Sequence, residues 1–238
     1  MSNPGSRIKS LLLAGLLLSS ALSAPVMAQE VRYSWLDLSF MVQDFDRMGT
    51  QTPVPGQIVD VHGTDGDGVR FRGSVGTWHN LYIFMDYGST DIDVDVLVTS
   101  PGGTFPAVDE FDFTDIRGGI GLKWSVGFAT DVYGEVSYDS FFLDFGSFAG
   151  EDFDTGNKDI GGALGVRSMI SDNLELRGYA RYSSHADLDL TTAVYDTGTL
   201  FGAGFGWQVI RGLSIVGDYE SGQFARWSIG FRLDLDEY

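Results

Sequence analysis

The sequence predicts an all-β fold: an antiparallel, up-and-down transmembrane β-barrel of about ten strands, with eight strands as the alternative. Three observations lead to this prediction. Apolar and polar residues alternate with a period of two along ten segments, which is the period of a β-strand. The connections between these segments alternate between short turns and longer polar stretches, as in outer-membrane barrels. Charged residues recur on the parity opposite the apolar ones, and a soluble core would not bury so many ions.

Residues 1–28 are predicted to be a secretory signal peptide. Two basic residues precede an apolar run at 11–22, and small residues before the predicted cut suit cleavage after Ala28. The run is short for a membrane-spanning helix, although a retained N-terminal anchor is the alternative. Residues 29–238 are then expected to form a single outer-membrane β-barrel domain.

Seven predicted strands precede the C-terminal part of the chain. In the first of them Leu36, Leu38 and Phe40 share one face, while Asp37 and Ser39 share the other. The seven strands cover residues 33–43, 69–77, 81–89, 114–124, 131–142, 159–170 and 174–184. Short turns are predicted at 78–80, 125–130, 171–173 and 210–212, and longer polar segments at 44–68, 90–113, 144–158 and 185–196.

Residues 199–235 carry the clearest alternation and are predicted to form the last three strands. Phe201, Phe205 and Trp207 share one parity, with glycine at most positions between them. A soluble sheet would bury this apolar face on a core. A transmembrane barrel instead turns the apolar face to lipid and keeps the polar face inside.

The composition restricts the possible partners. The chain has 33 acidic residues against 15 lysines and arginines, and its formal net charge is −18. Nucleic acid is therefore not expected as a partner, because phosphates require a basic surface. The chain contains no cysteine, which excludes disulfides and thiol chemistry. No cofactor is predicted, and the acidic segments are compatible with calcium or magnesium ions.

The polar parity carries bases and acids in similar numbers, so the barrel interior is expected to be nearly neutral. A narrow barrel is filled by its own side chains, and such charges are tolerated there only as a paired network. The predicted lumen charge network comprises Arg70, Arg72, Arg117, Lys123, Glu135, Asp139, Arg167, Glu175, Arg177, Arg181, Asp218 and Arg232.

The tryptophans are predicted to form an aromatic girdle, because indole rings favour the boundary between lipid and water. Trp35 begins the first strand, Trp78 lies in a short turn, and Trp124 and Trp207 end strands just before short turns. Short turns are periplasmic in such barrels, so these four are predicted to lie at the same membrane boundary. Trp227 is predicted to lie nearer the outer rim.

Two kinds of chemical site are weighed in the long segments. Asp91 and Asp93 follow one predicted strand, and His185 and Asp187 follow another, so an aspartate-assisted histidine base is conceivable. Alternate carboxylates also resemble the oxygen ligands of calcium loops, but no glutamate closes a twelve-residue EF-hand loop. The weak metal candidates are Asp65, Asp67, Asp91, Asp93 and Asp95.

Four stretches of the chain resemble small outer-membrane β-barrel proteins of the opacity/porin-like group. They are WLDLSF at 35–40, GDGVRFRGS at 66–74, NLYIFMDY at 80–87 and WSIGFR at 227–232. The resemblance implies a bacterial outer-membrane location, contact with the lipid bilayer and lipopolysaccharide, and insertion by the outer-membrane assembly machinery. That machinery usually reads an aromatic C-terminal residue on the lipid-facing parity, and Tyr238 is aromatic but lies on the other parity.

The function predicted from these features is that of an integral outer-membrane barrel with a structural or surface-interaction role and no evident catalysis. Three alternatives remain open: a small porin-like channel, an omptin-like outer-membrane hydrolase, and a soluble periplasmic barrel that binds a ligand inside.

Overall fold

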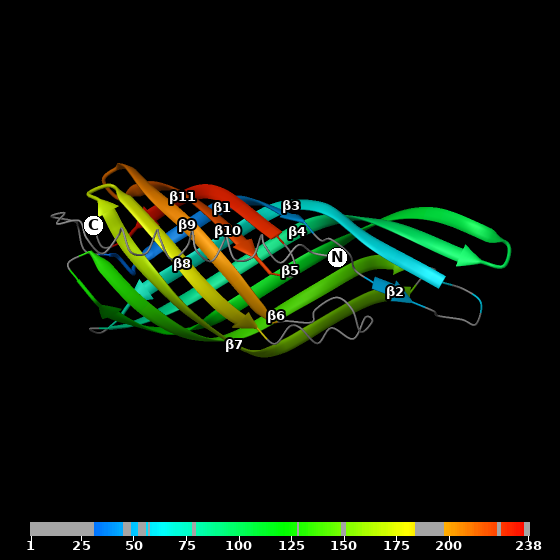
Figure 1. Cartoon of the computed structure of the whole chain (residues 1–238), viewed down its shortest axis with the longest axis horizontal. Helices are drawn as coiled ribbons and strands as arrows, with labels where there is room; N and C mark the ends of the chain where they lie inside the picture. Colours follow the sequence, from blue (N-terminus) through cyan, green and yellow to red (C-terminus); the bar gives the residue numbers. More distant parts are fainter. Residues whose placement is uncertain are drawn as a thin grey trace, which may run out of the picture.

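The computed structural model describes residues 31–44, 49–51, 56, 58–77, 80–127, 129–148, 151–183, 198–222 and 225–235 (Figure 1). The predicted signal peptide and Tyr238 lie outside the described residues. Within these ranges, no helix combines the length and the apolar character needed to cross a membrane.

The described residues form eleven β-strands. They are β1 Trp35–Asp44, β2 Gly49–Gln51, β3 Ile58–Gly76, β4 Leu81–Ser100, β5 Gly103–Ser125, β6 Thr130–Phe148, β7 Glu151–Ser171, β8 Leu174–Ser183, β9 Thr199–Ile210, β10 Leu213–Ser221 and β11 Ala225–Asp234.

Ten of these strands close into an antiparallel barrel, which confirms the predicted fold. Each strand from β3 to β11 pairs with the next along the chain, and β1 pairs with both β11 and β3. The short strand β2 pairs with β3 alone, among the strands that the structure describes. Closure leaves no unpaired sheet edge within the ring, which a membrane-spanning sheet requires.

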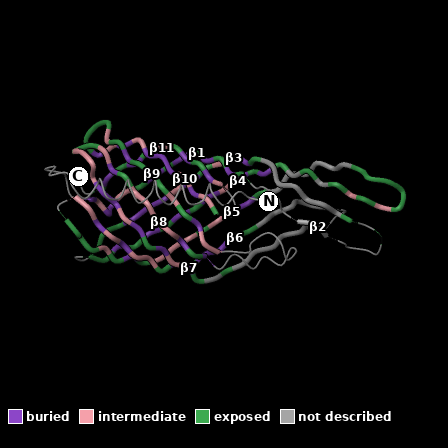
Figure 2. The backbone as a smooth tube through the Cα atoms, in the orientation of Figure 1, coloured by how far each residue is buried: buried purple, intermediate pink, exposed green. Residues whose placement is uncertain are grey.

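The two faces of the barrel wall differ in chemistry in the way that the alternation predicts. In β1, Leu38 and Phe40 are 62% and 51% exposed on the outside, whereas Asp37 and Ser39 are buried on the inside. Figure 2 shows the same exchange of buried and exposed residues along most strands of the ring. Large apolar side chains are exposed around the wall, a surface that lipid solvates and water does not.

The prediction of long polar loops at 44–68, 90–113 and 144–158 is wrong, because β-strands run through most of each segment. The segment 90–113 forms the outer half of a hairpin in which Ser100 of β4 pairs with Gly103 of β5. Likewise, β3 begins at Ile58, and β6 and β7 pair as far as Phe148 and Glu151. The stretch 91–96 itself alternates aspartate with isoleucine and valine, a strand signal that its acidity obscured. The fourth predicted loop, 185–196, lies outside the described residues.

The N-terminal residues 31–34 lie inside the periplasmic end of the barrel and precede the first strand, which starts at Trp35 and not at Tyr33 as predicted. Val31 and Tyr33 are buried in a cluster with Tyr82, Phe84 and Tyr133. The rings of Tyr33 and Tyr82 lie 4.7 Å apart, a normal separation for a stabilising aromatic pair. The segment therefore fills this end of the lumen with aromatic rings.

Three lumen tyrosines lie over glycines of the neighbouring strand. Tyr82 pairs with Gly121, Tyr133 with Gly165, and Tyr179 with Gly202. A Cβ atom added to any of these three glycines would overlap the tyrosine ring. The missing side chain thus makes room for each ring to lie flat against the barrel wall.

We expect Gly165→Ala to destabilise the barrel by about 1–3 kcal/mol, the usual cost of overpacking. The added methyl would displace the ring of Tyr133. Gly178→Ala is the matched control, because its Cβ would meet only a backbone oxygen at 3.9 Å. Urea unfolding in detergent micelles would compare the two variants, and equal stabilities would contradict the packing argument.

Candidate functional site

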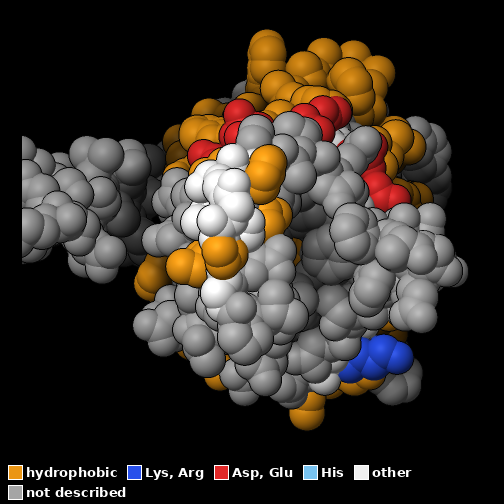
Figure 3. Space-filling model, turned by 90° about the vertical axis from the view of Figure 1, so that its right-hand side faces the viewer, with side chains coloured by type: hydrophobic (Ala, Val, Ile, Leu, Met, Phe, Trp, Pro, Cys, Tyr) orange, Lys and Arg blue, Asp and Glu red, His pale blue; other side chains and the backbone are white. Residues whose placement is uncertain are grey.

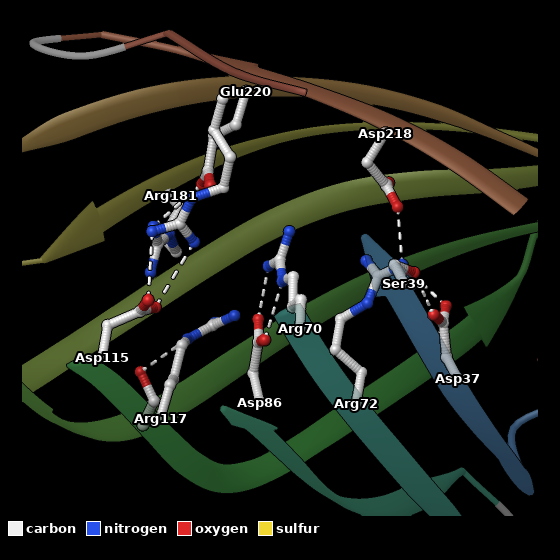
Figure 4. Close-up of polar contacts among 12 residues, drawn as sticks. Asp37, Ser39, Arg70, Arg72, Asp86, Asp115, Arg117, Arg181, Asp218 and Glu220 are labelled. Carbon is white, nitrogen blue, oxygen red and sulfur yellow. Dashed lines mark hydrogen bonds and ion pairs between the residues drawn. The ribbon is translucent and has the colours of Figure 1, made fainter. Parts of the chain in front are cut away.

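The centre of the lumen holds a network of ion pairs around Asp218 (Figure 4). Arg72 Nη2 donates to Asp218 at 2.6 Å and to Asp37 at 2.7 Å. Arg177 Nε donates to Asp218 at 2.7 Å, and its Nη2 donates to the same carboxylate. Ser39 Oγ donates to the second oxygen of Asp37 at 2.6 Å. Asp37, Arg72 and Asp218 are all buried, so each charge depends on these partners.

The network continues toward the periplasmic end through Arg232 and Arg167. Arg232 lies 3.6 Å from Asp37 and 3.4 Å from Glu175. Arg167 Nη2 donates to Glu175 at 2.7 Å. The guanidinium of Arg167 also lies 4.6 Å from the ring centre of Tyr33, within cation–π range. The charged network therefore contacts the aromatic cluster through Arg167 and Tyr33.

Further ion pairs complete the filling of the lumen. Arg70 makes two hydrogen bonds to Asp86, at 2.8 and 2.5 Å. Arg181 bonds to Glu220 at 3.0 Å. Arg117 Nη2 donates to Glu135 at 2.7 Å and its Nε lies 3.6 Å from Asp139, while Tyr82 donates to Glu135 at 2.9 Å.

The structure places all twelve residues of the predicted lumen charge network on the inward parity. Eleven of them form the ion pairs given above. The ammonium of Lys123 lies 4.5 Å from the ring centre of Tyr33.

Sequence reasoning missed Arg226 as a lumen residue. This side chain is 2% exposed, bonds to Gln43 at 3.1 Å and pairs with Asp115 at 3.1 Å. The sequence contained a signal for it, since Arg226 shares its parity with Ser228 and Arg232. The predicted last strand begins only at Trp227, whereas β11 begins at Ala225.

The tryptophans divide between the two faces of the wall. Trp124, Trp207 and Trp227 face outward and are 49–61% exposed. Trp35 does not, because it has the inward parity of Asp37, and the guanidinium of Arg232 lies 4.3 Å from its ring centre. Its assignment to the girdle is therefore wrong. Trp78 lies outside the described residues.

The acidic candidates for metal binding lie on the outer face of the wall. Asp65, Asp67, Asp91, Asp93 and Asp95 are all exposed there. Among the described residues, no three histidine, cysteine or acidic side chains converge as a metal site requires. Seen from the outer end, acidic groups lie in an arc along the upper side of the rim, next to apolar side chains (Figure 3).

The residues considered for catalysis are not brought together by what the structure describes. Asp91 and Asp93 point away from the lumen on β4, where their side chains are exposed. His185 and Asp187 lie outside the described residues.

Two small cavities lie in the described part of the lumen. One cavity of about 80 Å³ lies among Trp35, Arg72 and Tyr133, and another of about 40 Å³ lies beside Arg232 and Glu175. Ion pairs described above line both cavities, and the aromatic rings line the larger one. The described part of the lumen therefore resembles a filled interior more than an open channel.

A closed antiparallel barrel with an apolar outer wall and a charged interior defines an outer-membrane β-barrel protein. The comparison with known families agrees. The family described as "Outer membrane protein beta-barrel domain" matches residues 14–226, and the chain belongs to this family. Its location is accordingly the bacterial outer membrane, where the wall contacts the lipid bilayer. Among curated proteins, none matches the chain.

Several solved barrels are similar in structure. OprG from Pseudomonas aeruginosa is 10% identical with a TM-score of 0.45, and the match covers 87% of this chain and 98% of OprG. The translocator domain of the autotransporter NalP from Neisseria meningitidis is 14% identical with a TM-score of 0.44, over 97% and 98% of the two chains. Ail of Yersinia pestis is 10% identical with a TM-score of 0.38, over 84% and 99%.

Proposed function

We propose that this protein is a non-conducting membrane anchor that presents an extracellular β-sheet for surface interaction, without catalysis. The observation that carries the proposal is the contrast between the two parts of the barrel. The membrane-spanning part has a lumen filled by ion pairs and rings. The outer part extends strands beyond the ring, where they present surface to the cell exterior.

The first support is the closed interior. A conducting pore needs a continuous water-filled path, but the central ion pairs join β1, β3, β8 and β10 across the lumen. Below them, Tyr33 and its aromatic neighbours fill the periplasmic end. Moving the ion pairs would require breaking several buried charge-assisted hydrogen bonds, each worth about 1.5–3 kcal/mol.

The second support is the protruding hairpin of β4 and β5. Pairing between β5 and β6 is described only up to Asp112 and Asp144, whereas β4 and β5 stay paired to Ser100 and Gly103. The nine residues from 92 to 100 correspond to roughly 30 Å of additional strand. Figure 1 shows this hairpin reaching beyond the other strands, and β3 pairs with β4 as far as Thr99.

Pro106 fits this arrangement. It pairs with Leu97 of β4 in the part of β5 that lies beyond the described pairing with β6. Proline has no backbone N–H and cannot donate a ladder hydrogen bond, so within sheets it is largely confined to edge strands such as this part of β5. The proline also discourages unwanted pairing with other strands.

The exposed aspartates at the base of the hairpin suit contact with the lipopolysaccharide layer through divalent cations, as part of the same proposal. Asp67 pairs with Asp91, and Asp91 with Asp112, so three exposed carboxylates lie side by side on neighbouring strands. Such like charges repel each other unless cations reduce the repulsion. Insertion by the outer-membrane assembly machinery belongs to this proposal as well.

Planar bilayer recording tests whether the barrel conducts. We expect the folded protein to show no stable conductance steps, because the lumen is closed by the ion pairs and the aromatic cluster. A matched variant would replace residues 92–111 by Asn-Gly, a favoured two-residue hairpin turn, and should stay equally silent. Stable steps from the full-length protein would contradict the proposal and favour the small-channel alternative. Steps from the shortened variant alone would place the closure in the hairpin.

A further inference from the structure

The larger lumen cavity has an unusual lining. Five of its lining residues are arginines, and only Asp86 and Glu135 are carboxylates. The five arginines are Arg70, Arg72, Arg117, Arg167 and Arg177. Both carboxylates already accept hydrogen bonds, Asp86 from Arg70 and Glu135 from Arg117 and Tyr82. Both carboxylates of the lining therefore already have protein donors as partners.

Several hydrogen-bond donors of the same lining have no partner among the described residues. The buried atoms without a hydrogen bond are Tyr33 Oη, Trp35 Nε1, Arg70 Nη1, Arg72 Nε and Ser74 Oγ. The indole and guanidinium nitrogens are donors only, and the two hydroxyls can also donate. Leaving a buried donor unpaired is costly, so a group that accepts hydrogen bonds is expected to satisfy them.

The charges next to the cavity fall into two ion-paired groups. The larger group connects four arginines, Arg72, Arg167, Arg177 and Arg232, with three carboxylates, Asp37, Glu175 and Asp218, and carries one positive charge in excess. The smaller group, Arg117 with Glu135 and Asp139, carries one negative charge in excess. Three arginines of the larger group line the cavity, and the fourth lies over the ring of Trp35.

We propose that the lumen cavity binds one small monovalent anion, a halide or a carboxylate of about acetate size. Such an anion only accepts hydrogen bonds, and its charge cancels the excess of the larger group. Water molecules can satisfy the same donors, so the experiment that follows distinguishes a bound anion from water. A volume of about 80 Å³ exceeds the roughly 10–15 Å³ that a single water needs and accommodates a larger ion.

Bromide is the probe, because its anomalous scattering distinguishes it from water in a crystal. Crystals of the detergent-folded protein soaked in sodium bromide should show an anomalous peak among Trp35, Arg72 and Ser74. In solution, bromide should raise the urea midpoint relative to sodium gluconate at equal ionic strength, since gluconate is too bulky to enter and a ligand of the folded state stabilises it. A cavity that holds water only and an equal midpoint in both salts would overturn the proposal.

Conservative variants test the assigned donors. Ser74→Ala and Trp35→Phe each remove one unpartnered donor and leave every ion pair in place, so each should weaken bromide binding about tenfold or more. Ser140→Ala is the matched control, because Ser140 also has a buried hydroxyl without a partner but does not line the cavity. If Ser74→Ala and Trp35→Phe keep the bromide dependence of the Ser140→Ala protein, these donors do not form the site.

Discussion

Replacing Asp218 by alanine is expected to lower the free energy of unfolding by about 3–5 kcal/mol, the usual result of removing one partner of a buried ion pair. The carboxylate accepts hydrogen bonds from both Arg72 and Arg177, and it is 5% exposed. Its loss would leave two arginines buried with too little negative charge. Equilibrium urea unfolding in phosphatidylcholine vesicles, followed by tryptophan fluorescence, measures the change.

Two companion variants make this prediction specific to the lumen. Asp65→Ala removes an exposed aspartate from the outer wall and should change stability by less than about 0.5 kcal/mol. Adding Arg177→Met to Asp218→Ala should recover part of the loss, because it removes one of the two stranded charges. If Asp218→Ala is no more harmful than Asp65→Ala, the network does not stabilise the barrel.

Replacing Phe231 by arginine is expected to cost about 2–4 kcal/mol, the range found for an arginine facing lipid near the bilayer midplane. Phe231 lies near the middle of the outward face of β11 and is 61% exposed. The next residue, Arg232, is a buried native arginine that faces the lumen. An arginine at position 232 therefore faces the lumen, whereas an arginine at the adjacent position 231 would face lipid and lower the stability of the barrel.

An arginine placed on the outward face near the membrane interface is the control for Phe231→Arg. Val209 also faces outward, but it lies at the end of β9 beside a short turn. Val209→Arg should therefore cost only about 0–1 kcal/mol, as observed near the membrane interface. The same vesicle unfolding assay compares both variants, and similar costs at the two positions would argue against a lipid-facing wall.

Much of the fold was predictable from the sequence because the membrane makes the two faces of each strand chemically opposite. Alternation assigned Leu38 to the outside and Asp37 to the inside, and the structure agrees. Strand ends were less predictable. Where β4 leaves the membrane, Asp91 and Asp93 face water, so the apolar signal that marks a strand weakens although the hydrogen-bonded ladder continues.

The interior of the barrel was also only partly predictable from the sequence. Parity alone predicted that Arg72, Arg177 and Asp218 face the lumen, but not that one aspartate holds both arginines. That contact joins residues 146 positions apart, because closure of the ring leaves only β1 and β11 between β3 and β10.

The sequence by itself determined the class of fold, the face on which each strand residue lies and the rough charge balance inside, because a period-two pattern follows from backbone geometry. Only the tertiary structure decided which charges pair, that Trp35 lies under Arg232, and that residues 31–34 fill the periplasmic end. Those outcomes depend on strand register and on the width of the closed ring. Both are properties of the assembled barrel, and no single strand contains them.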